Sequence, residues 1–245
     1  MHSARFLWCG TAVCAACSSA LADRFSQYGP PHNPFVVGQL PSIGAGSFGT
    51  AFDALADGRL VAVTGNGVYL ERGPLANAYD LVANFDAAAM GGSVDPAFVR
   101  VSPSGGTIAV GGGFAKPVAV FPLAALGSPG SPSMLTSTSA GGSTKYFSVP
   151  HFDGEWFDDT RLALTAGTYG GDAHVTLLDA SGDPTAPLNP TVIDGIDGAS
   201  SGVAFDAAGR LFTGNGFDNS PGAPGTSDTG TIRAFEPSDW QAALG

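Results

Sequence analysis

The sequence predicts an all-β protein, a β-propeller with about four blades of roughly 50 residues each. Two observations predict it. Residues 205–216 nearly repeat residues 52–67, and weaker copies of the same unit lie between them at 101–113 and 156–167. Equivalent positions of the four units are spaced by 48, 54 and 49 residues, at Gly58, Gly106, Thr160 and Gly209. This period is that of a propeller blade and is too long for most helical repeats.

Each repeat predicts the same series of strands. A short alternating strand, as in 49–52 and 202–205, precedes a turn in which Asp57 and Gly58 and their equivalents supply a tight hairpin. The returning strand is the most apolar, which suits a position covered on both faces. These predicted middle strands are residues 60–63, 107–110, 162–164 and 211–213. Third strands are predicted at 68–70, 118–121, 174–178 and 231–235, and outer strands at 81–85 and 191–194.

The predicted propeller domain spans residues 23–245, with blades at about 35–80, 81–127, 133–180 and 190–245. Two connectors end in Ala-Ala-Leu-Gly, and in the second, Ser238 or Asp239 is expected to cap a short helical turn that ends at Gly245. Two ring sizes are compatible with these repeats. We favour four blades of a six- or seven-bladed propeller, and the alternative is a closed four-bladed ring completed by residues 34–40.

The first 22 residues have the layout of a secretory signal peptide. Arg5 precedes an apolar run from residue 6 to 16, and the small residues Ala20 and Ala22 form an Ala-x-Ala cleavage site. The apolar run is too short for a membrane anchor, which needs about 20 residues. We therefore expect an exported protein, in the periplasm, at the cell surface or secreted. All three cysteines lie in this segment, so no disulfide framework is expected in the mature chain.

The composition excludes one class of partner. The mature chain would keep all 21 acidic residues and nine of the ten basic ones, a formal charge of −12. Nucleic-acid binding depends on cationic contacts with phosphates, so we expect no nucleic-acid partner. The expected partners are a protein or a small molecule, such as a carbohydrate. No transmembrane segment is expected.

The recurring Phe-Asp-x-x-Gly-Arg-Leu and Thr-Gly-Asn-Gly units resemble those of exported bacterial propellers of the NHL-repeat, SMP-30/gluconolactonase-like and YVTN-type group. The resemblance covers roughly residues 35–245 and implies the architecture. For an SMP-30-type lactonase it would imply a metal at the axis, held by carboxylate and Asn side chains from several blades. This chain departs from that pattern, since no Glu precedes Phe52 in the first repeat.

Candidate metal ligands lie after the middle strands. Asn66 and Asn215 occupy equivalent places in the first and last repeats, and Asp218 and Asp228 lie in the oxygen-rich loop that follows Asn215. Calcium prefers such oxygen ligands, so these four residues form a candidate calcium site. Asn-Gly is also the strongest hairpin signal, so a purely structural turn at Asn66 is the simpler interpretation.

A second candidate site, for a ligand, lies before the inner strand of the third repeat. His151 and Glu155 precede that strand, where axial loops of a propeller lie. The neighbouring Asp158 and Asp159 align with a hairpin turn and are expected to be structural.

Two functions follow from these observations. The first is an exported, non-catalytic propeller that binds a ligand or a protein through loops at one end of its axis. The second is a calcium-dependent, lactonase-like hydrolase with part of its site in further blades.

Overall fold

The computed structural model describes residues 49–74, 76, 78–113, 115–167, 172–196, 202–214 and 232–244. The predicted signal peptide at 1–22, the predicted strand at 34–40 and Gly245 lie outside the described residues.

The described residues form four β-sheets, in which neighbouring strands are antiparallel except for one parallel pair at the edge of the first sheet. The first contains β1 (Thr50–Ala54), β2 (Leu60–Thr64), β3 (Gly67–Glu71) and β4 (Tyr79–Phe85). The second contains β5 (Phe98–Val101), β6 (Thr107–Gly111), β7 (Val118–Pro122) and β9 (Lys145–Phe147). The third contains β10 (Asp153–Trp156), β11 (Arg161–Ala166), β12 (Ala173–Asp179) and β13 (Thr191–Ile196). The fourth contains β14 (Val203–Phe205), β15 (Leu211–Gly214) and β16 (Ile232–Phe235).

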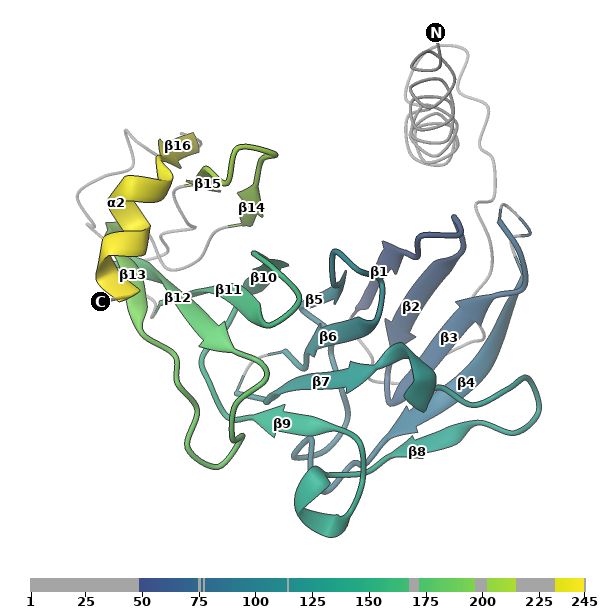
Figure 1. The fold of residues 1–245 in the computed structure, drawn as a ribbon. Helices are drawn as coiled ribbons and strands as arrows, with labels where there is room; N and C mark the ends of the chain where they lie inside the picture. Colours follow the sequence, from purple (N-terminus) through teal and green to yellow (C-terminus); the bar gives the residue numbers. More distant parts are fainter. Residues whose placement is uncertain are drawn as a thin grey trace, which may run out of the picture.

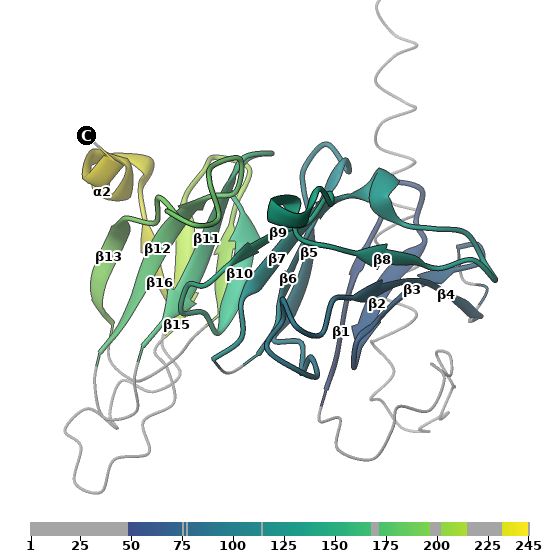
Figure 2. The same ribbon diagram turned by 90° about the horizontal axis from the view of Figure 1, so that it is seen from below.

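The sheets follow one another in an arc, and the first strand of each lies on the inner side (Figure 1). Strands β1, β5, β10 and β14 are therefore neighbours, although each belongs to a different sheet. Seen from below, the sheets lie side by side with their faces toward one another (Figure 2). This all-β, propeller-like arrangement of consecutive meanders agrees with the predicted repeat.

The apolar core consists of layers between adjacent sheets. All five residues of β2 are buried, as predicted for a middle strand covered on both faces. Because side chains alternate along a strand, neighbours in β6 enter different layers: Val110 packs toward the first sheet and Ala109 toward the third. The third layer lies between the third and fourth sheets and includes the fully buried Trp240.

The boundary between the first two sheets differs from the blade boundary predicted at residue 81, whereas the outer strand predicted at 81–85 agrees with β4. The first sheet extends through β4 to Phe85, so residues 81–85 do not begin the second sheet. A further strand, β8 (Ser133–Leu135), pairs in parallel with β4. The Gly127 N–H donates to the carbonyl of Val82, so the segment that joins β7 to β9 of the second sheet contacts the first sheet. The outer strand of the second sheet is therefore β9.

The hairpin between β2 and β3 also differs in detail. Thr64 pairs with Gly67, so the two turn residues are Gly65 and Asn66 and not the Asn-Gly pair. Gly65 has a φ of 53°, whereas Asn66 is not among the residues with positive φ. Positive φ at the first turn position alone is the pattern of a type II′ turn, for which glycine comes first.

Short helices connect or follow the strands: η1 (Leu123–Ala125), η2 (Thr138–Ala140), α2 (Pro237–Gln241) and η3 (Ala242–Leu244). The N-cap of α2 is Glu236 and not the expected Ser238 or Asp239. Asp239 instead accepts a hydrogen bond from the Glu236 N–H at 3.0 Å, as the reciprocal half of a capping box. None of the helices in the described ranges is long and apolar enough to cross a membrane.

Candidate functional site

Polar side chains on the inner strands join one sheet to the next. Each inner strand pairs on one side only, which leaves N–H and C=O groups on its other edge. Asp53 Oδ2 accepts from the Val101 N–H of the next sheet at 2.7 Å, and Asp153 Oδ2 accepts from the Val203 N–H at 3.2 Å. These carboxylates thus satisfy backbone groups that the sheets leave unpaired.

Arg100 makes the corresponding connection between the second and third sheets. Its guanidinium contacts Asp153 Oδ1 at 3.0 Å and Glu155 Oε2 at 3.1 Å. Burial raises the pKa of Glu155, and Arg100 opposes this shift. The Trp156 indole N–H donates to the Arg100 carbonyl at 3.0 Å in the same contact. Glu155, predicted as a ligand-binding residue, is therefore half of an ion pair between sheets.

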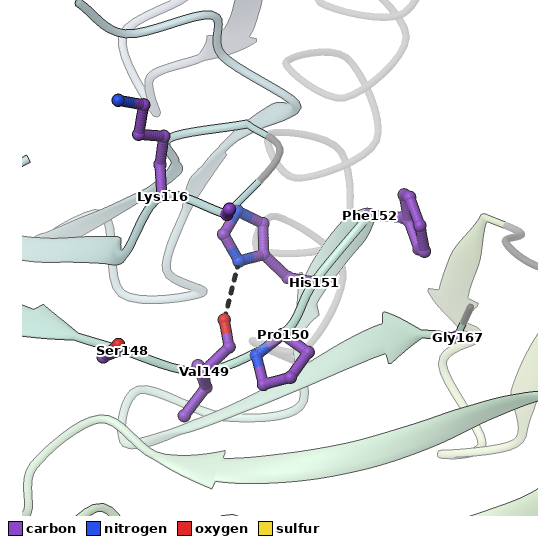
Figure 3. Close-up of a pocket in the computed structure, with 8 residues that line it drawn as sticks. Lys116, Ser148, Val149, Pro150, His151, Phe152 and Gly167 are labelled. Atoms are coloured by element: carbon purple, nitrogen blue, oxygen red, sulfur yellow. Dashed lines mark hydrogen bonds between the residues drawn. The ribbon is translucent and has the colours of Figure 1, made fainter. Parts of the chain in front are cut away.

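A pocket of about 400 Å³ opens beside the second and third sheets, at the edge where β6, β9 and β11 end. It lies between the loop after β6, the connection from β9 to β10 and the end of β11 (Figure 3). The lining residues are Ala115, Lys116, Ser148, Val149, Pro150, His151, Phe152 and Gly167. Its volume is within the range of small-molecule sites, about 300–1,000 Å³.

His151 is the buried polar residue of this pocket, 8% exposed. Its Nδ1 lies 3.0 Å from the carbonyl oxygen of Val149, shown dashed in Figure 3. A carbonyl only accepts, so Nδ1 carries the proton and Nε2 presents a lone pair. That Nε2 is buried and has no hydrogen-bond partner among the described residues. Burial lowers the pKa of His151, which keeps the ring neutral at pH 7.

Packing from the second sheet fixes the position of this imidazole. Phe98 contacts the His151 ring edge to face, with centroids 5.7 Å apart. Gly111 lies beneath both rings, because a Cβ atom there would come within 2.4 Å of the Phe98 ring and 2.8 Å of His151 Cδ2. A side chain at position 111 would therefore displace the histidine.

The pocket also contains a strained backbone position. Ala115 has a φ of 55°, and among the described residues it is the non-glycine with positive φ. This left-handed conformation costs about 1–2 kcal/mol for a residue with a Cβ atom. Such strain is often found at binding sites, where the surrounding structure maintains it.

A smaller pocket of about 230 Å³ lies at the opposite, hairpin end of the sheets and includes Lys145 and Asp159. The Lys145 ammonium donates to the carbonyls of Ala180 and Ser181. Asp159 accepts from the Ser104 N–H at 2.9 Å, which lowers the pKa of Asp159. This pocket is thus held together by contacts between the second and third sheets.

Asp158 stabilises its own hairpin, as expected for a turn residue. Although burial raises its pKa, hydrogen bonds from Arg161 and Thr160 prevail and hold the pKa of Asp158 at about 2. The same Asp–Arg pairing occurs in two other hairpins, between Asp57 and Arg59 and between Asp206 and Arg210.

The structure gives Asn66 a structural contact. Its Oδ1 accepts from the Val94 N–H at 3.1 Å, so the amide fixes the connection between β4 and β5. The other predicted calcium ligands, Asn215, Asp218 and Asp228, lie outside the described residues. Within the described ranges, no group of three or more His, Cys, Asp and Glu side chains is arranged to hold a metal ion.

His151 and Glu155, predicted together, perform different tasks. Only His151 lines the pocket, and residues four apart on an extended chain are about 13 Å apart. Sequence reasoning missed Arg100, Gly111 and Ala115. No local sequence signal indicates the contact of Gly111 with a histidine 40 residues later in the chain.

Comparison with known proteins does not assign the chain to a family. No family model matches the chain, and no curated protein sequence matches it. Five chains of solved structures match. One is from a crystal structure of a nidogen/laminin complex, with 14% sequence identity and a TM-score of 0.49, over 78% of this chain and 60% of that one. The matched region thus spans less than two thirds of that structure's chain.

Proposed function

We propose that this protein is an exported, non-catalytic β-propeller that binds a small ligand in the pocket around His151. The observation that carries the proposal is the pocket of about 400 Å³ itself, a volume typical of small-molecule sites, with the buried His151 in its wall. Buried polar atoms are almost always hydrogen-bonded, and an exception calls for an explanation.

The energetics of the pocket favour binding. An unsatisfied buried acceptor such as His151 Nε2 costs about 1–3 kcal/mol. Ala115 adds strain at the same place. Two unfavourable features in one pocket are expected where ligand binding, and not the stability of the free protein, is the selected property.

Export and blade number belong to the same proposal. The signal-like segment at residues 1–22 supports export. The repeat of about 50 residues and the consecutive meanders support a propeller, for which we retain six or seven blades as the preferred number and a closed ring of four as the alternative. A protein partner at the same end of the axis would use the loops that surround the pocket.

Fragment screening by NMR tests the proposal. A library of small neutral and charged compounds is added to ¹⁵N-labelled protein, and shifts are followed at Ser148, His151 and Phe152. We expect hits that shift these resonances and that are lost in His151→Phe. The matched control is His174→Phe, which changes a histidine of β12 that does not line the pocket. If no compound moves the pocket resonances, the pocket is not a binding site.

We do not propose the calcium-dependent hydrolase. Of its suggested ligands, Asn66 uses its side-chain oxygen for Val94, and the other three lie outside the described residues.

A further inference from the structure

We propose that His151 makes residues 148–152, the connection between β9 and β10, sensitive to acid. The neutral imidazole holds this segment against the second sheet, and the protonated imidazole releases it toward solvent. The segment forms one wall of the pocket of about 400 Å³, so its release changes the shape of that pocket. The inference goes beyond the proposed function and does not require that a ligand binds.

The surroundings of the His151 ring suit only its neutral form. Nδ1 donates to the Val149 carbonyl at 3.0 Å, whereas Nε2 is buried without a hydrogen-bond partner among the described residues. The ring carbon bonded to Nε2 is Cδ2, and it faces Gly111, where an added Cβ atom would come within 2.8 Å. Protonation would therefore place a charged N–H next to the second sheet, without an acceptor. Such a buried donor is costly, so protonation favours any state that exposes it.

The charged side chains on the elements around this ring have other interactions. They are Lys116 on the loop after β6, Asp95 between β4 and β5, Arg100 on β5, and Asp153 and Glu155 on β10. Lys116 donates to a backbone carbonyl, Arg100 pairs with both carboxylates of β10, and Asp95 also has a partner. The lowered pKa of His151 results from burial, which outweighs the opposing effect of the Val149 carbonyl, and not from a neighbouring charge.

The segment has space beside it into which it can move. The pocket lies along residues 148–152, and Figure 3 shows Phe152 pointing away from the His151 ring. Ser148 and Pro150 are exposed, and Pro150 has no N–H to donate. The Phe152 N–H donates to the carbonyl of Thr165 in β11 at 2.7 Å. Exchange of this amide hydrogen therefore reports on release of the segment.

The direction of the pH effect follows from the two protonation states. In the released segment the ring has the ordinary histidine pKa of about 6.5, whereas burial lowers the pKa of His151 in the folded state. The stabilisation by the neutral ring is complete above that ordinary value and is lost as the pH falls toward the folded pKa. The equilibrium constant for release then rises by up to about tenfold per pH unit, or up to about 30-fold between about pH 7.5 and 5.0.

Amide hydrogen exchange of the full chain over this pH range tests the inference. Protection factors, which correct for the pH dependence of chemical exchange, are compared at Phe152 and at Val63 of the buried strand β2. We expect protection at Phe152 to fall by at least about threefold, and by up to about 30-fold, relative to Val63. The ring nitrogen shifts of His151 in the same samples should titrate with a midpoint below about 6.5.

Variants assign the effect to this ring. His151→Gln cannot take up a proton and should remove the fall at Phe152, whereas His174→Gln, in β12 and outside the pocket wall, should retain it. Glu155→Gln should also retain it, although burial raises the pKa of that neighbouring carboxyl.

Three results would overturn the inference. They are a His151 midpoint at or above about pH 6.5, a fall at Phe152 of less than about threefold relative to Val63, and an undiminished fall in His151→Gln. The first two are measured on the unmodified chain, so they do not depend on the folding of a variant. None of the three affects the fragment screen, which tests the proposed function separately.

Discussion

Replacing Asp53 with alanine tests whether carboxylates on the inner strands hold adjacent sheets together. Asp53 Oδ2 accepts from the Val101 N–H at 2.7 Å, across the boundary between the first and second sheets. Val101 pairs with Ile108 in β6 but directs this N–H to the free edge of β5, so the variant leaves the group without its partner. A hydrogen bond to a charged acceptor is worth about 1.5–3 kcal/mol. We expect Asp53→Ala to lower the free energy of unfolding by about 2 kcal/mol.

Asp57→Ala is the matched control, four residues away in the same hairpin. Asp57 pairs with Arg59 at 2.7 Å, but its side chain is 52% exposed. Exposed pairs contribute about 0–1 kcal/mol, so the control should lose less than half as much. Asp53→Asn should lie between the two, because an amide oxygen still accepts from Val101.

Urea denaturation followed by circular dichroism gives the free energies, and amide hydrogen exchange reports on the bond itself. The Val101 N–H should exchange faster in Asp53→Ala and unchanged in Asp57→Ala. The reasoning is refuted if Asp53→Ala costs no more than its control, or if the Val101 amide is equally protected in both variants.

Four further changes have defined outcomes. Trp240→Ala removes a fully buried side chain and should cost about 3–5 kcal/mol in urea denaturation; a loss below 1 kcal/mol would contradict the packing of α2. Gly111→Ala should cost about 1–3 kcal/mol and shift the NMR resonances of the pocket imidazole, since its Cβ meets two rings; unchanged shifts would speak against the contact. Ala115→Gly should raise the midpoint of thermal unfolding or leave it unchanged, whereas Ala119→Gly in buried β7 should lower it; equal losses would exclude strain at position 115. Asp158 has a folded pKa of about 2, below its usual value of 3.8, so its contribution is present above pH 4 and is lost as the pH falls toward 2. Asp158→Asn should remove about 1 kcal/mol at neutral pH, reduced by solvent at this partly exposed site, and flatten stability against pH in that window, as denaturation at several pH values would show; an unchanged slope would contradict the shift.

The predictions that agree with the structure rest on local signals. The turn glycines Gly58 and Gly209 have φ values of 82° and 78°, as their hairpins require. The apolar runs at β2 and β11 became middle strands with both faces covered. Turn chemistry and alternation along a strand operate within a few residues, so the sequence expresses them directly.

The features that local signals do not indicate depend on contacts between distant segments. The strand β8 crosses to the first sheet because of contacts between residues 127 and 82. For Asn66 the simpler, structural interpretation fits the contact of its side-chain oxygen with the Val94 N–H, 28 residues away along the chain. Glu155 remains a predicted ligand-binding residue, and in the structure it pairs with Arg100 of the adjacent sheet. Each of these contacts involves a residue in a distant segment, which a local sequence pattern does not identify.

The sequence by itself determined an all-β chain of repeated meanders. The repeat period and the turn residues can be recognised directly from the order of residues along the chain. The tertiary structure decided which polar groups remain free to act. Most of the conspicuous Asp and Asn side chains in the described residues bind backbone groups of hairpins or of a neighbouring sheet. Among the described residues His151 Nε2 has no partner, since the backbone carbonyl of Val149 binds the other ring nitrogen and the packing of Phe98 over Gly111 fixes the ring. This position of the imidazole depends on contacts between three distant segments, which only the folded chain brings together.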